Sequence, residues 1–204
     1  MKTLNKFIGT LAVAAILCTS CGDGIGNSDP CYNYGLLLIF KDVAGNYLSE
    51  GLEYNGYVSD VIPDAGYGPV KPDLYSLEVV FPETCMYMVP PDGGSYTYPN
   101  RFPELVISTP KSKHDAIDSN FYLMINIVTP KHKCSFAKTF TIKMKCPHIF
   151  GDEKIHEIET WWTGKNFESA SPDVRCTRIK LDGKEVDISY VENMIYPSLV
   201  TVIL

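Results

Sequence analysis

The sequence has few of the patterns by which enzymes are usually detected. It contains no Gly-x-Ser-x-Gly turn for a nucleophilic serine. The segment His156 to Thr160 lacks the second histidine of a helical zinc-protease motif. Gly93-Gly94 is not followed by Lys-Ser or Lys-Thr, so no phosphate-binding loop is expected. We therefore predict that the chain is not an enzyme, with no catalytic residues and no cofactor.

Metal-ligand residue types are also sparse. Cys146, His148, His156 and Glu157 form one local group, but their spacing matches no closed zinc pattern, so no metal site is expected. The pair Glu157 and Glu159 would share one face of a strand, about 7 Å apart. Glycosidase carboxylates normally come from different elements, so this pair is better explained as part of a solvated face.

Long apolar segments and long helices are scarce as well. No amphipathic helix of twelve or more residues is evident, and the apolar stretch Phe7 to Leu17 has only eleven residues. A helix that crosses a membrane needs about 20 apolar residues. Because Lys2 and Lys6 precede this stretch, residues 1–20 are predicted to be a secretory signal peptide.

Thr19-Ser20-Cys21 places two small residues before a cysteine at the exit of the signal. This arrangement resembles the lipobox of bacterial lipoproteins, which implies that Cys21 is the lipid anchor and the first residue after cleavage. Cys18 stands where the family favours leucine. Cys18 is also the rival anchor, but the bulky Leu17 would then precede the cut. The alternative is an ordinary signal peptide without lipidation.

Residues 21–32 are rich in Gly and Asp and are predicted to form a lipidated, flexible tether. Enteric lipoproteins retained in the inner membrane carry Asp directly after the lipidated cysteine, whereas this chain has Gly22. The resemblance therefore implies the outer membrane. Surface-exposed Bacteroidetes lipoproteins often carry an acidic cluster here, of which Asp23 and Asp29 are a thin version. Both the periplasmic face and the cell surface remain open.

Positive charge is in deficit. The formal net charge is −6 at pH 7, and removal of Lys2 and Lys6 makes it two units more negative. An acidic body repels phosphate backbones, so no nucleic-acid partner is expected. The 13 Tyr and 9 Phe favour strands over helices. Residues 33–204 are long enough for one domain with a hydrophobic core.

The mature body has an odd number of cysteines beyond the anchor, so at least one is unpaired or bonded to another molecule. They are Cys31, Cys85, Cys134, Cys146 and Cys176. Disulfides are permitted outside the cytoplasm. A straight strand between Cys134 and Cys146 would keep these two apart. Open pairings include Cys31 with Cys85, and Cys176 with Cys134 or Cys146; buried free thiols are the alternative.

About nine or ten strands with little helix are predicted, at spacings set by Pro- and Gly-rich turns. They are Leu36–Phe40, Tyr54–Ile62, Tyr75–Phe81, Leu105–Ile107, Phe121–Val128, Phe136–Met144, Ile155–Trp162, Val174–Leu181, Glu185–Ser189 and Leu199–Leu204. Asp182-Gly183 is the strongest hairpin signal. The loops at 63–72 and 82–103 are expected to be irregular. This pattern predicts an all-β antiparallel sandwich.

A hydrophobic strand followed by Lys41-Asp42-Val43-Ala44-Gly45-Asn46 looks like the start of immunoglobulin-like and transthyretin-like modules in Bacteroidetes lipoproteins. Together with the lipobox, the chain resembles uncharacterised lipoproteins of the Bacteroidales. The resemblance implies a fold and an address but no activity.

Trp161-Trp162 is the main candidate for ligand binding. Adjacent strand residues face opposite sides, so one Trp should enter the core and the other should stand beside Glu157 and Glu159. An exposed Trp with tyrosine-rich loops at Tyr87 and Tyr96–Tyr98 could stack on sugars or anchor a protein.

We therefore predict a non-catalytic protein, attached to the membrane through its N-terminal lipid, that binds an envelope protein or another ligand. A glycan-binding surface lipoprotein is one alternative. A subunit of an envelope or pilus-like assembly, with Leu199–Leu204 as a swapped strand, is the other.

Overall fold

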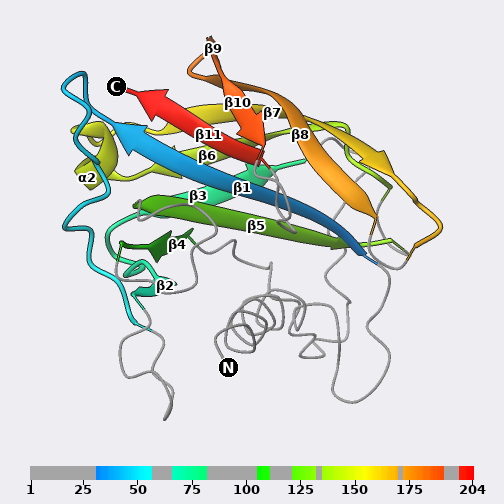
Figure 1. The fold of residues 1–204 in the computed structure, drawn as a ribbon, viewed down its shortest axis with the longest axis horizontal. Helices are drawn as coiled ribbons and strands as arrows, with labels where there is room; N and C mark the ends of the chain where they lie inside the picture. The colour runs from blue at the N-terminus through cyan, green and yellow to red at the C-terminus, as the bar shows by residue number, and fades with distance from the viewer. Residues whose placement is uncertain are drawn as a thin grey trace, which may run out of the picture.

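The computed structural model describes residues 31–56, 66–81, 105–110, 121–131, 135–169, 172–190 and 198–204. The described part is an all-β sandwich, as predicted (Figure 1). Its strands are β1 (Cys31–Lys41), β2 (Tyr67–Pro69), β3 (Ser76–Val80), β4 (Leu105–Ser108), β5 (Tyr122–Pro130), β6 (Thr139–Lys145), β7 (His156–Lys165), β8 (Asp173–Leu181), β9 (Lys184–Val186), β10 (Ile188–Tyr190) and β11 (Ser198–Ile203). The one helix in this part, α2 (Pro147–Phe150), is a single turn.

The first layer is a six-stranded sheet in the order β10-β11-β1-β5-β4-β2. Strand β1 lies in its middle, and every residue from Leu36 to Phe40 is at most 5% exposed, as expected for a strand buried on both faces. Most pairings are antiparallel, but β1 and β11 run parallel, with Leu37 opposite Leu199. A parallel pair requires a long connection, and here the whole second layer lies between the two strands in the chain.

The second layer is a five-stranded antiparallel sheet in the order β3-β6-β7-β8-β9. One face of this sheet is exposed to solvent, as strand β6 shows. Phe140, Ile142 and Met144 are at most 3% exposed, whereas Lys143 and Lys145 lie on the other face. This alternation was predicted from the sequence and is confirmed.

A single hydrophobic core fills the space between the layers. Tyr34 of β1 reaches across to the second sheet, where its ring meets Phe140 and Trp162 edge to face at 5.2 Å each. Its hydroxyl accepts the backbone N–H of Ala137 at 2.8 Å, so the polar end of this fully buried side chain is paired. Tyr34 therefore ties the two sheets together.

Two expectations about strands were wrong. The segment 63–72 contains the short edge strand β2, in which Pro69 is tolerated because an edge strand need not donate every backbone N–H. The predicted strand Glu185–Ser189 is divided at Asp187: β9 closes the hairpin with β8, and β10 joins β11 in the other sheet. Asp182 (φ 49°) and Gly183 (φ 78°) form the predicted turn of that hairpin.

The predicted strand Tyr54–Ile62 is represented in the described part only by a bridge from Tyr54 to Val70. The rest of that strand beyond residue 56 and the loop at 82–103 lie outside the described residues. The terminal strand Leu199–Leu204 corresponds to β11, which is paired on both sides within its own sheet. Strand β1 begins at Cys31, two residues before the domain start expected at residue 33.

The cysteines of the body divide into two groups. Cys31 is disulfide-bonded, and its partner lies outside the described residues. Cys146 and Cys176 are free, buried thiols, so the proposed bonds from Cys176 to Cys134 or Cys146 are wrong. Cys176 lies on the inner face of β8, where its sulfur donates to the Arg178 carbonyl at 3.2 Å. Both thiols act as small hydrophobic residues of the core.

Candidate functional site

The two tryptophans of β7 lie on opposite faces of the second sheet. Trp162 is 4% exposed and stacks on Phe140, with ring centroids 5.5 Å apart. Its indole N–H donates to Thr160 Oγ1 at 2.8 Å, and that hydroxyl donates to the Phe140 carbonyl. Trp162 is therefore a core residue with its polar group paired, and it offers no surface to a ligand.

Trp161 lies on the outer face and is half-buried. The guanidinium of Arg178 stands 4.6 Å from the ring centroid, and the Lys180 ammonium is 5.8 Å away, both at cation–π range. Arg178 Nε donates to Glu185 Oε1 at 2.9 Å, and this bond raises the pKa of Arg178. Charged neighbours within the chain thus already occupy the surroundings of Trp161. The tyrosines at Tyr87 and Tyr96–Tyr98 lie outside the described residues.

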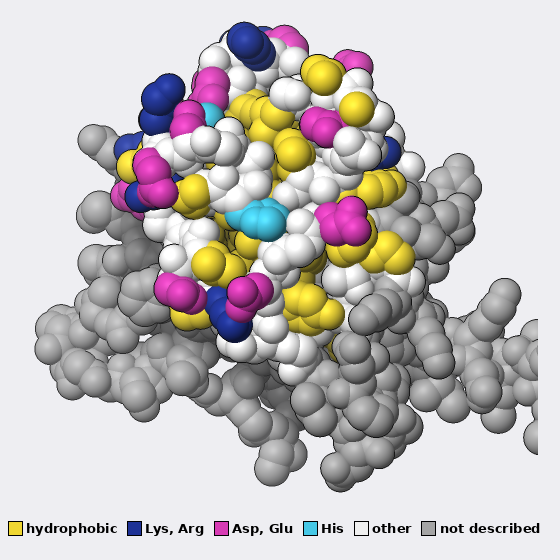
Figure 2. Space-filling view, turned by 90° about the vertical axis from the view of Figure 1, so that its left-hand side faces the viewer, with side chains coloured by type: hydrophobic (Ala, Val, Ile, Leu, Met, Phe, Trp, Pro, Cys, Tyr) yellow, Lys and Arg dark blue, Asp and Glu magenta, His cyan; other side chains and the backbone are white. Residues whose placement is uncertain are grey.

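Two hollows lie at one end of the sandwich, the end that carries α2 and the segment from Lys41 to Gly56 (Figure 1). Figure 2 looks onto this end, where hydrophobic side chains are exposed between acidic ones and a histidine lies near the centre. Residues Glu50 to Tyr54 separate the hollows, and we call them the Glu50–Tyr54 ridge. Its Gly51 and Glu53 line both hollows.

Four features hold the ridge in place. The Asp42 carboxylate accepts the backbone N–H groups of Ala44 and Asn46 at 2.9 and 2.8 Å, which fixes the turn that leads to the ridge. Leu52 is 4% exposed and anchors the ridge to the core. Gly51 takes a positive φ of 80°, which other residues rarely adopt. The His148 ring of α2 meets the Glu50 carbonyl at 2.9 Å.

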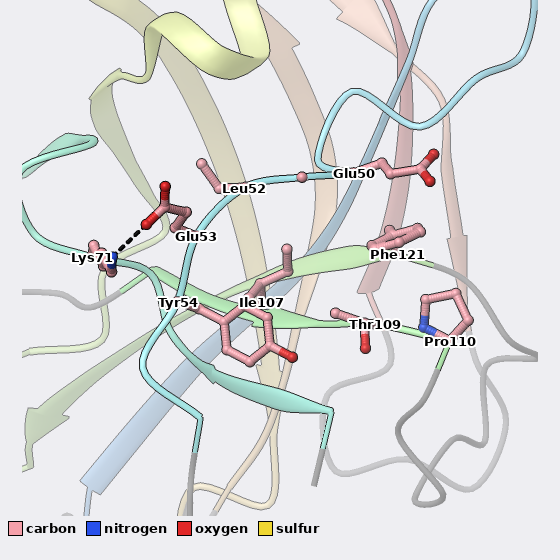
Figure 3. Close-up of a pocket in the computed structure, with 10 residues that line it drawn as sticks. Glu50, Leu52, Glu53, Tyr54, Lys71, Ile107, Thr109, Pro110 and Phe121 are labelled. Carbon is pink, nitrogen blue, oxygen red and sulfur yellow. Dashed lines mark hydrogen bonds and ion pairs between the residues drawn. The ribbon is translucent and has the colours of Figure 1, made fainter. Parts of the chain in front are cut away.

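The larger hollow, which we call the groove, has a volume of about 640 Å³. It is lined by residues 50–54, Lys71, Ile107, Thr109, Pro110 and Phe121. In Figure 3 the Tyr54 ring lies across its middle, with the hydroxyl pointing along the groove toward Thr109. Lys71 and Glu53 form an ion pair at one end, and Phe121, Pro110 and Glu50 stand at the other. A cavity of this size is typical of small-molecule sites.

The ion pair sets the electrostatics of the groove. The hydrogen bond and the charge of Lys71 lower the pKa of Glu53, and Glu53 in turn raises the pKa of Lys71. Both groups are therefore charged at neutral pH and neutralise each other. The Glu50 carboxylate forms no ion pair with any described residue. Counted over the described residues that line it, the groove carries about one net negative charge.

The smaller hollow has a volume of about 510 Å³ and lies on the other side of the ridge. It is lined by Gly51, Glu53, residues 73–76, Lys145, Pro147, His148 and Glu153. Lys145 and Glu153 are paired at 2.7 Å across it. Among the described residues that line it, Tyr75 is the one aromatic ring besides His148, and its hydroxyl accepts the backbone N–H of Leu105 at 3.2 Å.

Of the two described histidines, His156 has the more complete set of partners. Its Nδ1 lies 2.7 Å from Asp182 and its Nε2 lies 3.0 Å from Asp152, and its ring stacks on Phe150 at 3.8 Å. Partial burial lowers the pKa of His156, but the bonds to Asp182 and Asp152 outweigh that effect and leave the pKa raised. With both nitrogens occupied, His156 has no free nitrogen to act as a base.

Sequence reasoning placed Trp161 and Trp162 correctly on opposite faces but missed the groove and the His156 cluster. The groove residues come from four separate chain segments, none with a motif of its own. Asp182 is 26 residues from His156 and was noted only as a turn residue. The cluster of Cys146, His148, His156 and Glu157 is not brought together as a metal site: within the described ranges, no three His, Cys, Asp or Glu side chains could hold a metal ion. His114, His132 and Cys21 lie outside the described residues.

Comparison of the chain with protein-family models, with curated proteins and with solved structures finds no match. The fold and the site define the protein as an all-β sandwich that has a groove at one end, lined by polar and aromatic side chains. Within the described residues, no helix is long and apolar enough to cross a membrane.

Proposed function

We propose that this chain is a non-catalytic lipoprotein of the bacterial envelope, anchored through Cys21, that binds a ligand or partner with its β-sandwich. The observation that carries the proposal is Thr19-Ser20-Cys21 directly after the apolar stretch Phe7 to Leu17. Two or more acyl chains on the new terminus would anchor the chain stably, since each buried CH₂ contributes about 0.8 kcal/mol. The Gly22 position favours the outer membrane.

The position of the sandwich relative to the anchor supports a role close to the membrane. Strand β1 begins at Cys31, so residues 22–30 connect it to the lipid. Nine residues reach at most about 30 Å when fully extended. The body would therefore remain within about one domain diameter of the lipid surface and could meet ligands or proteins there.

The chemistry of the described residues supports a binding role rather than catalysis. Burial raises the pKa of Cys176 to about 11 and also raises the pKa of Cys146, so both thiols are protonated and poorly nucleophilic at neutral pH. His156 is occupied by two carboxylates. The groove, by contrast, presents polar groups and aromatic rings to solvent.

The test is the Cys21→Ala variant, expressed from the full-length gene in a bacterium that processes lipoproteins. We expect the wild-type protein to sediment with membranes and to yield an acylated peptide that begins at Cys21. The variant should remain folded but appear in the soluble fraction, because the acyl chains are the strongest membrane attraction that the chain offers.

Cys18→Ala is the matched control, and it should leave acylation and membrane attachment unchanged. A Cys21→Ala product that still sediments with membranes, or a wild-type terminus without lipid, would rule out this proposal.

A further inference from the structure

We infer that the groove beside the Glu50–Tyr54 ridge is the ligand site, and that its ligand is a neutral saccharide. The inference rests on the proposed binding function and gives it a place and a chemical class. It differs from the prediction made from Trp161 and Trp162. Four properties of the groove carry it: its mixed lining, its charge, the covered edge of β2 and its aromatic surface.

The lining of the groove matches the two kinds of surface that a sugar ring presents. A pyranose has apolar C–H faces and a rim of hydroxyl groups that both donate and accept hydrogen bonds. Tyr54 and Phe121 offer flat aromatic surfaces, to which Pro110 adds an apolar edge (Figure 3). The Glu50 carboxylate offers acceptor atoms beside them. Thr109 is already committed, because its hydroxyl donates to the Gly66 carbonyl at 2.9 Å.

The charge of the groove disfavours anionic ligands. Lys71 is neutralised by Glu53, so it does not act as a free cation for phosphate or uronate. Glu50 adds a carboxylate that would repel an anion. The paired Lys71 and Glu53 nevertheless retain hydrogen-bonding capacity for uncharged hydroxyl groups. A neutral ligand with many hydroxyls can bond to these groups without meeting charge repulsion.

The backbone around the groove disfavours an extended peptide. Peptides often bind by adding a strand to an open sheet edge. Here the ridge and the residue after it cover the edge of β2: Asn55 N–H donates to the Pro69 carbonyl at 2.8 Å, and Lys71 N–H donates to the Glu53 carbonyl at 3.1 Å. The Val70 N–H is taken by the Leu105 carbonyl at 2.8 Å. A peptide therefore cannot extend the sheet by pairing directly with β2.

The surface around Trp161 is less suitable. Arg178 stands over the Trp161 ring, where β7 and β8 pair. A sugar that stacked on the covered face of Trp161 would have to displace a guanidinium held by Glu185. The groove demands no such displacement.

The experiment uses the full-length protein extracted from membranes in detergent. The probes are neutral oligosaccharides of glucose, mannose, xylose and N-acetylglucosamine, an acidic oligogalacturonate, and a set of extended peptides. Binding is measured by titration calorimetry. We expect at least one neutral oligosaccharide to bind with a dissociation constant between about 10 μM and 1 mM, and oligogalacturonate and the peptides to bind more weakly.

Variants locate the site. Glu50→Gln removes the charged acceptor without a change of shape, and it should weaken binding by about tenfold, the value of one hydrogen bond to a charged group. Phe121→Leu should weaken binding by a similar factor. The matched controls are Glu153→Gln in the smaller hollow and Trp161→Ala on the outer face, and both should leave affinity within about twofold.

Several results would overturn the inference. They are preferential binding of oligogalacturonate or peptide, the absence of binding by every neutral probe, and a Glu50→Gln affinity equal to wild type. Loss of binding in Trp161→Ala would show that the ligand binds on the outer face and not in the groove. Because Glu50 is exposed, its variant should fold even if Phe121→Leu does not. Acylation at Cys21 is measured independently, so a failed saccharide test would leave the anchoring proposal intact.

Discussion

The outer face around Trp161 and the groove beside the Glu50–Tyr54 ridge both combine aromatic rings with charged side chains, but they use them differently. Around Trp161, the cations of β8 lie over the ring and also pair with Glu185 across the adjacent strand. In the groove, one ion pair is closed, while Glu50 and the Tyr54 ring face open space. The same residue types therefore pair with one another on a sheet face in one place and line a hollow in the other.

This difference follows from where the residues stand. On a sheet face, every side chain has neighbours at fixed distances on the adjacent strands, so complementary charges pair within the chain. At the end of a sandwich, strands stop and irregular segments must cover the core. Hollows arise where that cover is incomplete, as on both sides of the Glu50–Tyr54 ridge.

The largest predicted effect is on stability, and it differs between the two tryptophans. Trp162→Ala should lower the free energy of unfolding by about 3–5 kcal/mol, because it leaves a cavity between Phe140 and Tyr34. Trp161→Ala, its matched control on the neighbouring position, should cost about 1 kcal/mol or less. Urea unfolding followed by circular dichroism measures both. Equal losses in the two variants would show that Trp161 is also a core residue.

A smaller effect concerns His156, whose charged form is held by Asp182 and Asp152. A raised pKa means that protonated His156 stabilises the fold below its unfolded value of about 6.5, and that this contribution is lost as the pH rises through the folded pKa. The pKa values of both carboxyls are lowered, so their contribution is lost only in acid. Lys154, 3.5 Å from Asp152, is the other charged group at this cluster.

His156→Gln tests this cluster. Near pH 5 the free energy of unfolding of His156→Gln should be about 1 kcal/mol lower than that of the wild type. A hydrogen bond between buried charged groups would contribute more, but here solvent screens the carboxylates. The difference from the wild type should shrink above neutral pH. Urea unfolding at pH 5, 7 and 9 gives the comparison. His148→Gln, which loses only a contact to a backbone carbonyl, should show no such pH dependence. A difference that widened with pH would contradict the assignment.

The smallest effect is expected on the outer face. Arg178→Ala should leave the unfolding transition nearly unchanged, because the side chain is exposed and its ion pair is screened by solvent. It should nevertheless uncover one face of Trp161, so that acrylamide quenches tryptophan fluorescence more strongly. Arg175→Ala on the same strand, where the arginine pairs with Asp173, is the control and should not change quenching. Unchanged quenching in Arg178→Ala would mean that Arg178 does not cover the ring in solution.

Much of the sandwich was predictable because local patterns agree with the tertiary contacts. The alternation in Phe140, Ile142 and Met144 predicted β6, and Asp182-Gly183 predicted the turn after β8. The errors occur where pairing with a strand distant in the sequence determines whether a segment forms a strand and which sheet it joins. Strand β2 exists because β4 pairs with it, and the division at Asp187 exists because β10 has β11 as a neighbour in the other sheet.

The candidate site was not predictable in the same way. Trp161 and Trp162 were conspicuous because they are rare and adjacent, and period-two geometry placed them on opposite faces. Nothing in the order of the residues indicated that Arg178, seventeen positions later, would lie over Trp161. The groove was missed because Glu50, Lys71, Thr109 and Phe121 become neighbours only when four distant segments meet.

The sequence by itself determined the alternation of the strands, the turn at Asp182-Gly183 and the expectation of an exported, lipid-anchored chain, because these depend on residues close together in the chain. The tertiary structure decided the parallel pairing of β1 with β11, the free state of Cys146 and Cys176, the carboxylate partners of His156 and the shape of the groove. Each of these depends on contacts between distant segments, which form only when the two sheets close over a common core.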